Sequence, residues 1–288
     1  MIKAPFPWFG GKSRAADLIW SRLGNVSNYV EPFAGSLAVL LARRGVTGTE
    51  TVNDADCYLS NFWRAVSSEP EAVAEWCDWP VSEADQNARH LWLVNRVEFR
   101  ERMNTDPHFY DVKIAGWWVY GINCWIGDGW CELKGNAGRG VNRQLPHLGD
   151  AGQGVLDYFC ALQDRLRRVR ICCGDWARVL TPSVTEKHGV TGVLLDPPYD
   201  SSENQEYAAG TMCAQDVATW ARENGDNPNL RIALCGYEGD YQMPGDWVCE
   251  QGKARKGYQK DVDAAKKERV WFSPHCLSAG TLFDEVIV

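Results

Sequence analysis

Runs of apolar residues that stop at an acidic side chain recur along this chain. The run Gly192-Val-Leu-Leu ends at Asp196, and other runs end at Glu31, at Asp54 and at Asp175. A short apolar run bounded by turn residues is typical of a parallel strand that is buried on both faces. The pattern therefore predicts a mostly parallel sheet with acidic residues at the carboxyl ends of its strands, which is where open α/β sheets bind ligands.

Helical periodicity fills much of the chain between these strands. We expect helices over residues 13–23, 57–66, 70–78, 82–103 and 155–168, and a further apolar helix that follows a turn ending at residue 36. Ser82-Glu-Ala-Asp85 has the pattern of a capping box. More strands are expected over 229–237 and 247–249, with edge strands over 269–273 and 282–288. The alternation predicts a doubly wound, Rossmann-like α/β fold with antiparallel strands towards its carboxyl end.

The composition changes between about residues 104 and 154, which we interpret as an inserted module. Its aromatic side chains are expected to form a small core of their own: Trp117, Trp118, Tyr120, Trp125 and Trp130. A glycine-rich loop then follows with three cations and no acid, namely Lys134, Arg139 and Arg143. It is the best candidate for a phosphate or groove contact, and a solvated loop is the alternative. The basic segment 253–269, with Lys253 and Arg255, is a second candidate of the same kind.

Two glycine turns near the amino terminus are candidate ligand sites. Gly10-Gly11 lets the backbone approach a ligand closely, and Lys12 adds a positive charge that suits a phosphate or a carboxylate. The turn at Ala34-Gly35-Ser36 lies between a strand and a helix but lacks the three glycines that a pyrophosphate requires, so it favours a nucleoside. Asp54 could hold ribose hydroxyls or could instead cap the next helix.

Asp196-Pro197-Pro198-Tyr199 forms a rigid segment at the end of its strand. The prolines hold the backbone extended, so that the Pro197 carbonyl and the Asp196 carboxylate are both acceptors in fixed directions. Two acceptors and an aromatic ring suit a planar amine such as the amino group of a flipped base. The alternative is a strand end that is closed by an ordinary turn.

Composition narrows the class of protein. The 288 residues are 45% hydrophobic and 24% charged, as in a soluble globular protein with a full core. We expect a cytoplasmic protein, because no apolar run is long enough for a membrane span and no signal peptide is evident. The eleven cysteines form no zinc-binding pattern, so we expect reduced thiols and no metal. The net charge of −8 is unusual for a DNA-binding protein, although a local groove can still contact phosphates.

Taken in order, these motifs resemble the adenine-N6 DNA methyltransferases of the alpha group, the Dam-type family. That family has a Trp-x-Gly-Gly-Lys segment, then a Glu-Pro-Phe-x-Gly loop, a target-recognition insertion and an Asp-Pro-Pro-Tyr strand. Here these are Trp8 to Lys12, Glu31 to Gly35, roughly residues 71–149, and Asp196 to Tyr199. The resemblance implies a catalytic domain in two parts, 1–70 and 150–288, that flank the recognition insertion at 71–149.

The resemblance also implies a methyl donor, S-adenosylmethionine, and double-stranded DNA as the partner of a monomer or weak dimer. The implied cofactor-binding residues are Trp8, Gly11, Lys12, Glu31, Pro32, Phe33, Ala34, Gly35, Ser36, Asp54, Asp175, Trp176 and Asp196. Asp196, Pro197, Pro198 and Tyr199 would take a flipped adenine. Two departures stand out: the insertion does not resemble the Dam recognition module, and the strand after the catalytic one reads Cys235-Gly-Tyr237 where a more polar segment is expected.

Other nucleic-acid enzymes fit the sequence less well. A cytosine-C5 methyltransferase requires a Pro-Cys dipeptide and a zinc deaminase requires H-x-E with P-C-x-x-C, and the chain has neither. Cytosine-N4 methylation remains an alternative, although an acid at position 196 in place of serine favours adenine. RNA adenine methylation and a catalytically silent binder are also open. A stand-alone modification enzyme of a bacterium or phage, orphan or part of a restriction-modification system, is the expected setting.

Overall fold

The computed structural model describes residues 2–8, 10–45, 48–126, 129–132, 141, 154–198, 208–252 and 268–278. The chain divides into two compact units. The first unit consists of residues 1–9 with 53–175, and the second of residues 10–52 with 176–288. The chain thus passes between the units three times, once within a strand.

A sheet with the strand order β3-β2-β1-β4-β5-β7-β6 confirms the predicted fold class. Its parallel part contains β1 (Asn28–Glu31), β2 (Thr49–Asp54), β4 (Thr191–Leu195) and β5 (Leu230–Tyr237). All five residues of β4 are buried, as the continuous apolar run predicts. On one side of the sheet the pairing is antiparallel: β5 pairs with β7, and β7 pairs with β6.

The edge position expected for residues 269–273 is wrong. These residues form β7 (Glu268–Phe272), which lies between β5 and β6 (Val248–Gln251), so β6 is the edge strand of that side among the described residues. Val270, Trp271 and Phe272 are all buried, which suits a strand with a partner on each side. The strand expected over 282–288 lies outside the described residues.

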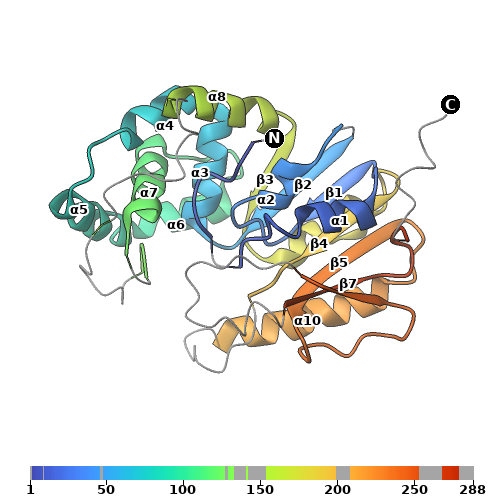
Figure 1. Cartoon of the computed structure of the whole chain (residues 1–288). Coiled ribbons are helices and arrows are strands. Elements are labelled where there is room, and N and C mark those ends of the chain that lie inside the picture. The colour runs from blue at the N-terminus through green and yellow to red at the C-terminus, as the bar shows by residue number, and fades with distance from the viewer. Residues whose placement is uncertain are drawn as a thin grey trace. The chain divides into compact units, whose positions relative to one another are not determined.

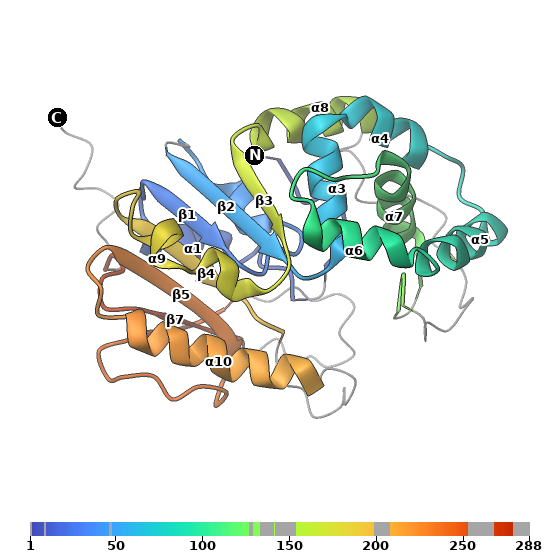
Figure 2. The same cartoon turned by 180° about the vertical axis from the view of Figure 1, so that it is seen from behind.

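Helices cover both faces of the sheet in the second unit. Figures 1 and 2 show α1 (Ala16–Leu23) on one face, and α9 (Pro182–Thr185) with α10 (Ala208–Asn224) on the other. The short α2 (Ala38–Ala42) follows the turn after β1, and the one-turn η1 (Trp176–Val179) precedes α9. This arrangement is the doubly wound fold that the sequence predicts.

The first unit is mainly helical. It contains α3 (Cys57–Ser68), α4 (Pro70–Cys77), α5 (Glu83–Val94), α6 (Val97–Thr105), α7 (Val112–Cys124), α8 (Val155–Leu166) and the strand β3 (Val169–Cys173). Ser82 caps α5 by accepting a hydrogen bond from the Asp85 backbone amide, which is one half of the predicted capping box, while the Ser82 amide donates to the Tyr120 hydroxyl. Asp56, and not Asp54, caps α3.

Two helix predictions in this unit are wrong in detail. The helix expected over 82–103 breaks at Asn95, whose side-chain amide donates to the Leu91 carbonyl. Such side-chain bonds to the backbone compete with helical hydrogen bonds. Helix α7 was not predicted, because its glycines, Gly116 and Gly121, lower its apparent helix propensity. Both glycines lie where a Cβ would collide with a tryptophan side chain, which explains their presence.

The expected separate aromatic core of the inserted module is wrong, because Trp118 of α7 packs on Phe6 and Phe62 and so belongs to the core of the whole first unit. Trp118 is 2% exposed and its ring meets the Phe6 ring edge to face, with 5.0 Å between the ring centroids. Tyr120 and Trp125 are buried as well. Edge-to-face packing adds about 0.5–1.5 kcal/mol per pair beyond the burial of area. These side chains therefore stabilise the helical unit itself.

Candidate active site

The site is built on the carboxyl end of β4 in the second unit. Asp196 follows the last residue of this buried strand, then comes Pro197, which is buried, and Pro198, which is exposed. Because prolines donate no backbone hydrogen bond, the strand ends here, and the Asp196 side chain is held at the edge of the sheet. The Asp196 side chain is 20% exposed and is therefore accessible to a ligand.

Lys12 lies beside Asp196 and is almost completely buried. Its ammonium nitrogen is 2.9 Å from Asp196 Oδ1 and 2.9 Å from Glu268 Oε1. It also donates to the carbonyl of Gly10 at 2.6 Å. These three acceptors match the three N–H donors of an ammonium group. The sequence left open whether Lys12 binds a phosphate or a carboxylate. In the structure it pairs with two carboxylates of the chain itself, those of Asp196 and Glu268.

The electrostatics of this cluster keep Lys12 charged. Burial alone would lower the pKa of Lys12, but the neighbouring Asp196 and Glu268 carboxylates outweigh it and the pKa lies above its usual value. Burial, reinforced by Asp196, raises the pKa of the nearby Cys235 thiol well above its ordinary value. Cys235 is therefore a neutral side chain here, and the segment that was expected to be more polar is buried around it.

The end of β1 supplies a second buried acid. Glu31 is 4% exposed and accepts a hydrogen bond from the Tyr29 hydroxyl at 3.1 Å. Burial, together with the Glu31 carboxylate, raises the pKa of the Tyr29 phenol. Pro32 and Ala34 are buried as well, so this loop presents its backbone more than its side chains.

The turn after β1 has the predicted form. Gly35 has φ 47° and Leu37 has φ 55°, and the Leu37 amide donates to the Ala34 carbonyl at 2.9 Å. A left-handed leucine is unusual, and the cost is offset by complete burial of the Leu37 side chain. Ser36 is buried between them.

Phe33 and Trp176 come together in the second unit although they are far apart in sequence. Their ring centroids are 6.3 Å apart with 28° between the ring planes. Both side chains are only partly buried, so they form an aromatic surface that is open to a planar ligand. Trp176 begins η1, directly after the exposed Asp175.

Three predicted cofactor residues belong to the first unit. Trp8 is half-buried and packs edge to face on Phe6 with a centroid distance of 5.9 Å. Asp54 Oδ1 accepts the Asp56 amide at 2.9 Å, which places its carboxylate at the turn between β2 and α3. Asp175 follows β3, and the Gly174 amide donates to the Asp54 carbonyl at 3.0 Å. The ends of β2 and β3 are thus neighbours in this unit.

Several predicted site residues lie outside the described part of the chain. They are the catalytic candidate Tyr199 and the DNA-binding candidates Lys134, Arg139, Arg143, Lys253 and Arg255. Their roles stay predictions.

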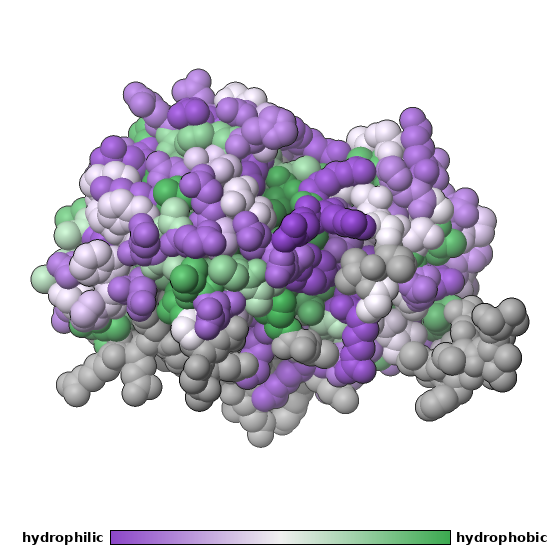
Figure 3. Space-filling model, turned by 90° about the horizontal axis from the view of Figure 1, so that it is seen from above, coloured by the Kyte–Doolittle hydropathy of each residue, from purple (hydrophilic) through white to green (hydrophobic). Residues whose placement is uncertain are grey.

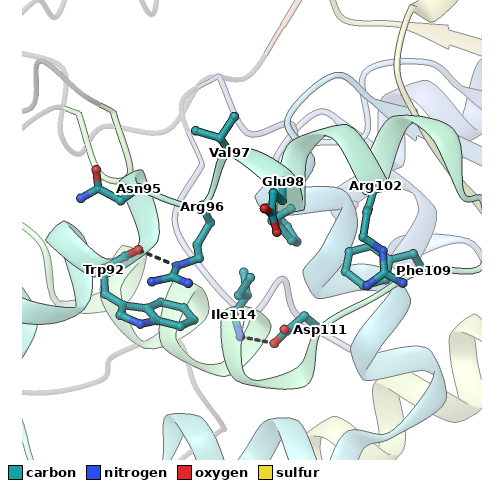
Figure 4. Close-up of a pocket in the computed structure, with 10 residues that line it drawn as sticks. Trp92, Asn95, Arg96, Val97, Glu98, Arg102, Phe109, Asp111 and Ile114 are labelled. Atoms are coloured by element: carbon teal, nitrogen blue, oxygen red, sulfur yellow. Dashed lines mark hydrogen bonds between the residues drawn. The ribbon is translucent and has the colours of Figure 1, made fainter.

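A cavity of about 470 Å³ lies in the helical unit, between α5, α6 and the start of α7. Figure 4 shows Arg96 turned back towards Trp92, and Arg102 against Phe109. The two guanidinium groups lie 4.0 Å and 3.8 Å from the centroids of these rings. The acidic residues Glu98 and Asp111 also line the cavity, so its lining carries charges of both signs. The Asp111 side chain caps α7 by accepting the Ile114 amide.

The comparisons with known proteins identify the reaction. Residues 8–124 match the family model described as D12 class N6 adenine-specific DNA methyltransferase. The chain is a DNA adenine methyltransferase. The match confirms the resemblance to adenine-N6 methyltransferases that the motifs indicate, and DNA is the substrate of this methyltransferase. No curated protein matches the chain.

The matched segment contains Lys12 and the Glu31–Ser36 loop but ends well before Asp196. The Lys12–Asp196 ion pair therefore connects the part of the methyltransferase that carries the family match to a motif outside it.

Glu268 is the residue of this site that sequence reasoning missed. It lies near the end of the basic segment 253–269 and belongs to no motif, and its place on the antiparallel strand β7 brings it to Lys12. The sequence gives little signal for it, because Arg269 separates this acid from the apolar run Val270-Trp-Phe272.

Two further observations concern the described residues as a whole. None of their helices has the length and apolar character needed to cross a bilayer. Nor do they contain a cluster of three or more His, Cys, Asp or Glu side chains that could hold a metal ion.

Proposed function

We propose that this methyltransferase transfers a methyl group from S-adenosylmethionine to N6 of an adenine that is flipped out of double-stranded DNA. The observation that carries the proposal is Asp196 at the end of β4, partly exposed and paired with Lys12. The family match supports adenine-specific methylation of DNA. What we propose in addition is that the cofactor is S-adenosylmethionine and that the target adenine is flipped out of a duplex.

The residues of the second unit fit this cofactor. S-adenosylmethionine carries a purine ring, a ribose and a positively charged sulfonium. The Phe33–Trp176 pair offers an aromatic surface for the purine, and the acidic side chains Glu31 and Asp196 stand at the carboxyl ends of the neighbouring parallel strands β1 and β4. Excess negative charge at a buried site favours a cationic ligand. The bound cofactor would supply an activated methyl group on sulfur.

The remaining cofactor contacts are proposed from the family pattern. Gly11, Pro32, Ala34, Gly35 and Ser36 would approach the cofactor through their backbone, Asp54 would hold the ribose and Asp175 the purine. Trp8 would lie near the methionine end. The partial burial of Trp8 and Asp54 and the exposure of Asp175 support these roles.

Asp196 and the Pro197 carbonyl would act on the amino group of the target base. The lone pair of an aromatic amine is delocalised into the ring, which makes the nitrogen a poor nucleophile. Two acceptors that take its two hydrogens favour the pyramidal nitrogen, whose lone pair points out of the ring plane. Lys12 supports this role because its positive charge keeps Asp196 ionised. Tyr199 would stack on the flipped base, an interaction worth about 1–3 kcal/mol.

Cytosine-N4 methylation is the second candidate, because its amine chemistry is nearly the same. The acid at position 196 and the adenine-specific family match both favour adenine.

The variant Asp196→Ala tests the assignment of the acceptor. We expect the methylation rate to fall at least a hundredfold, about the cost of removing one transition-state hydrogen-bond partner. Binding of S-adenosylmethionine, measured by calorimetry, should survive. Asp246→Ala is the matched control, since Asp246 is an exposed acid of the same unit. An Asp196→Ala enzyme within tenfold of the wild-type rate would overturn the assignment.

A further inference from the structure

Glu268 is a deeply buried carboxylate that belongs to none of the sequence motifs. It is the first residue of β7 and pairs with Tyr237 at the end of β5, and its carbonyl accepts the Gly252 amide at 2.9 Å. These contacts fix its backbone, while its side chain, 8% exposed, reaches Lys12. Acidic side chains are rarely buried to this extent without a partner. The ion pair with Lys12 is therefore what allows Glu268 to be buried.

Lys12 is shared equally between two carboxylates. The distance from its nitrogen to Glu268 Oε1 is 2.9 Å, and that to Asp196 Oδ1 is also 2.9 Å. One cation between two anions leaves one negative charge in the cluster. If Lys12 faced Asp196 alone, it would neutralise that carboxylate and weaken it as a hydrogen-bond acceptor.

Two further titratable groups lie close enough to Asp196 to feel its charge, namely Cys235 on β5 and Tyr241 shortly after β5. Burial raises the pKa of Cys235 and that of Tyr241, so both are neutral near pH 7. Neither of these neutral groups changes the charge of the cluster, in which Lys12 attenuates the charge of Asp196 and Glu268 competes for Lys12.

We propose that Glu268 is a positioning residue for methyl transfer: by sharing Lys12, it anchors the ammonium and keeps the Asp196 carboxylate a strong acceptor for the amino hydrogens of the base. This inference rests on the proposed function of Asp196. This role requires no contact between Glu268 and the base or the methyl group.

The first readout of the test needs no turnover. In ligand-free protein with ¹³C-labelled aspartate carboxyls, the Asp196 signal is the one that is lost in Asp196→Asn. Because removal of a neighbouring negative charge disfavours protonation, we expect Glu268→Gln to move the titration midpoint of this signal to lower pH. The control is Glu238→Gln. It removes an exposed carboxylate that pairs with Arg269, the neighbour of Glu268 on β7, and it should leave the Asp196 midpoint unchanged.

The second readout separates positioning from folding. We expect Glu268→Gln to lower kcat about tenfold to a hundredfold, the range typical of residues that orient a catalytic group, with cofactor affinity changed by less than about threefold. Glu268→Asp keeps the charge but shortens the side chain, so the midpoint should remain near the wild-type value while kcat falls. If the glutamine variant does not fold, the aspartate variant decides the question by the same two readouts.

The outcomes distinguish this inference from the proposed function. Wild-type kcat and an unmoved midpoint in Glu268→Gln, or a wild-type kcat in Glu268→Asp, would overturn the positioning role. If Asp196→Ala retains turnover, the proposed function itself fails, whatever Glu268 does.

Discussion

Asp196 and Lys12 show how charged side chains are stabilised at the edge of this sheet by ion pairing. A lysine ammonium that is 5% exposed would be costly alone, but three acceptors surround it and two of them carry negative charge. Asp196 gains a fixed partner and still keeps part of its surface open to a ligand. The sequence could predict the acid, because it ends an apolar run, and could predict the lysine, because it follows a double glycine. Their contact with Glu268 could not be predicted, since it depends on a strand pairing between distant parts of the chain.

His90 is a second buried titratable group, and it makes stability depend on pH. Its ring is 4% exposed, stacks on Trp125 at 4.9 Å between the ring centroids, and accepts the Cys131 amide through Nδ1. Burial lowers the pKa of His90 below its ordinary value of 6.5. The unfolded chain therefore binds this proton more readily than the folded protein does.

We predict that the free energy of unfolding decreases as the pH falls below about 6.5, because protonation of His90 then favours the unfolded state. Denaturant titrations at several pH values measure this slope. His90→Gln keeps an acceptor for the Cys131 amide but does not titrate, so its slope between pH 6.5 and 5 should be shallower than that of the wild type. Equal slopes in the two proteins would show that His90 is not responsible.

At the scale of elements, the contact between α4 and α7 depends on a glycine. A Cβ at Gly116 would lie 2.8 Å from the Val73 carbonyl oxygen and would collide with the Trp76 side chain. The two helices can therefore approach closely only while residue 116 has no side chain. The same glycine is one reason why α7 could not be predicted from propensity.

Gly116→Ala should therefore destabilise the protein, although alanine is normally the better helix former by about 1 kcal/mol. Overpacking against a backbone oxygen costs about 1–3 kcal/mol, and the clash should exceed the gain in propensity. Thermal unfolding followed by circular dichroism measures the loss. Gly245→Ala is the control, because nothing lies within 4 Å of a Cβ at that position. A Gly116→Ala protein as stable as the wild type would contradict the close packing of α4 and α7.

The strands were easier to predict than the helices for a physical reason. Buried parallel strands such as β4 need continuous apolar runs, and such runs are visible in the sequence. The end of α5 at Asn95 depends on one side-chain hydrogen bond, and the central place of β7 depends on which strands it pairs with. Neither is encoded in a local pattern.

For the whole molecule, the question is how an acidic protein engages DNA. The net charge is −8, and Figure 3 shows a described surface that is mostly polar, with apolar residues in separate small areas. Phosphate contacts must then come from local groups of cations, because the overall field repels a polyanion. The basic segments around Lys134 and Lys253 remain the sequence-based candidates for that role.

The family match and the buried cluster support the same chemistry from different parts of the chain. The match ends at residue 124, whereas Asp196 and Glu268 lie far beyond it, and Lys12 joins the two. The ion-pair cluster is thus the structural link between the recognised methyltransferase segment and the proposed acceptor of the target base.

The most direct test is to identify the methylated nucleoside. Purified protein is incubated with methyl-labelled S-adenosylmethionine and unmethylated duplex DNA, and the DNA is then digested to nucleosides and separated. We predict that the label appears in N6-methyladenine, and that Asp196→Ala leaves the DNA unlabelled. Label in N4-methylcytosine, or no label while the cofactor remains bound, would contradict the proposed reaction.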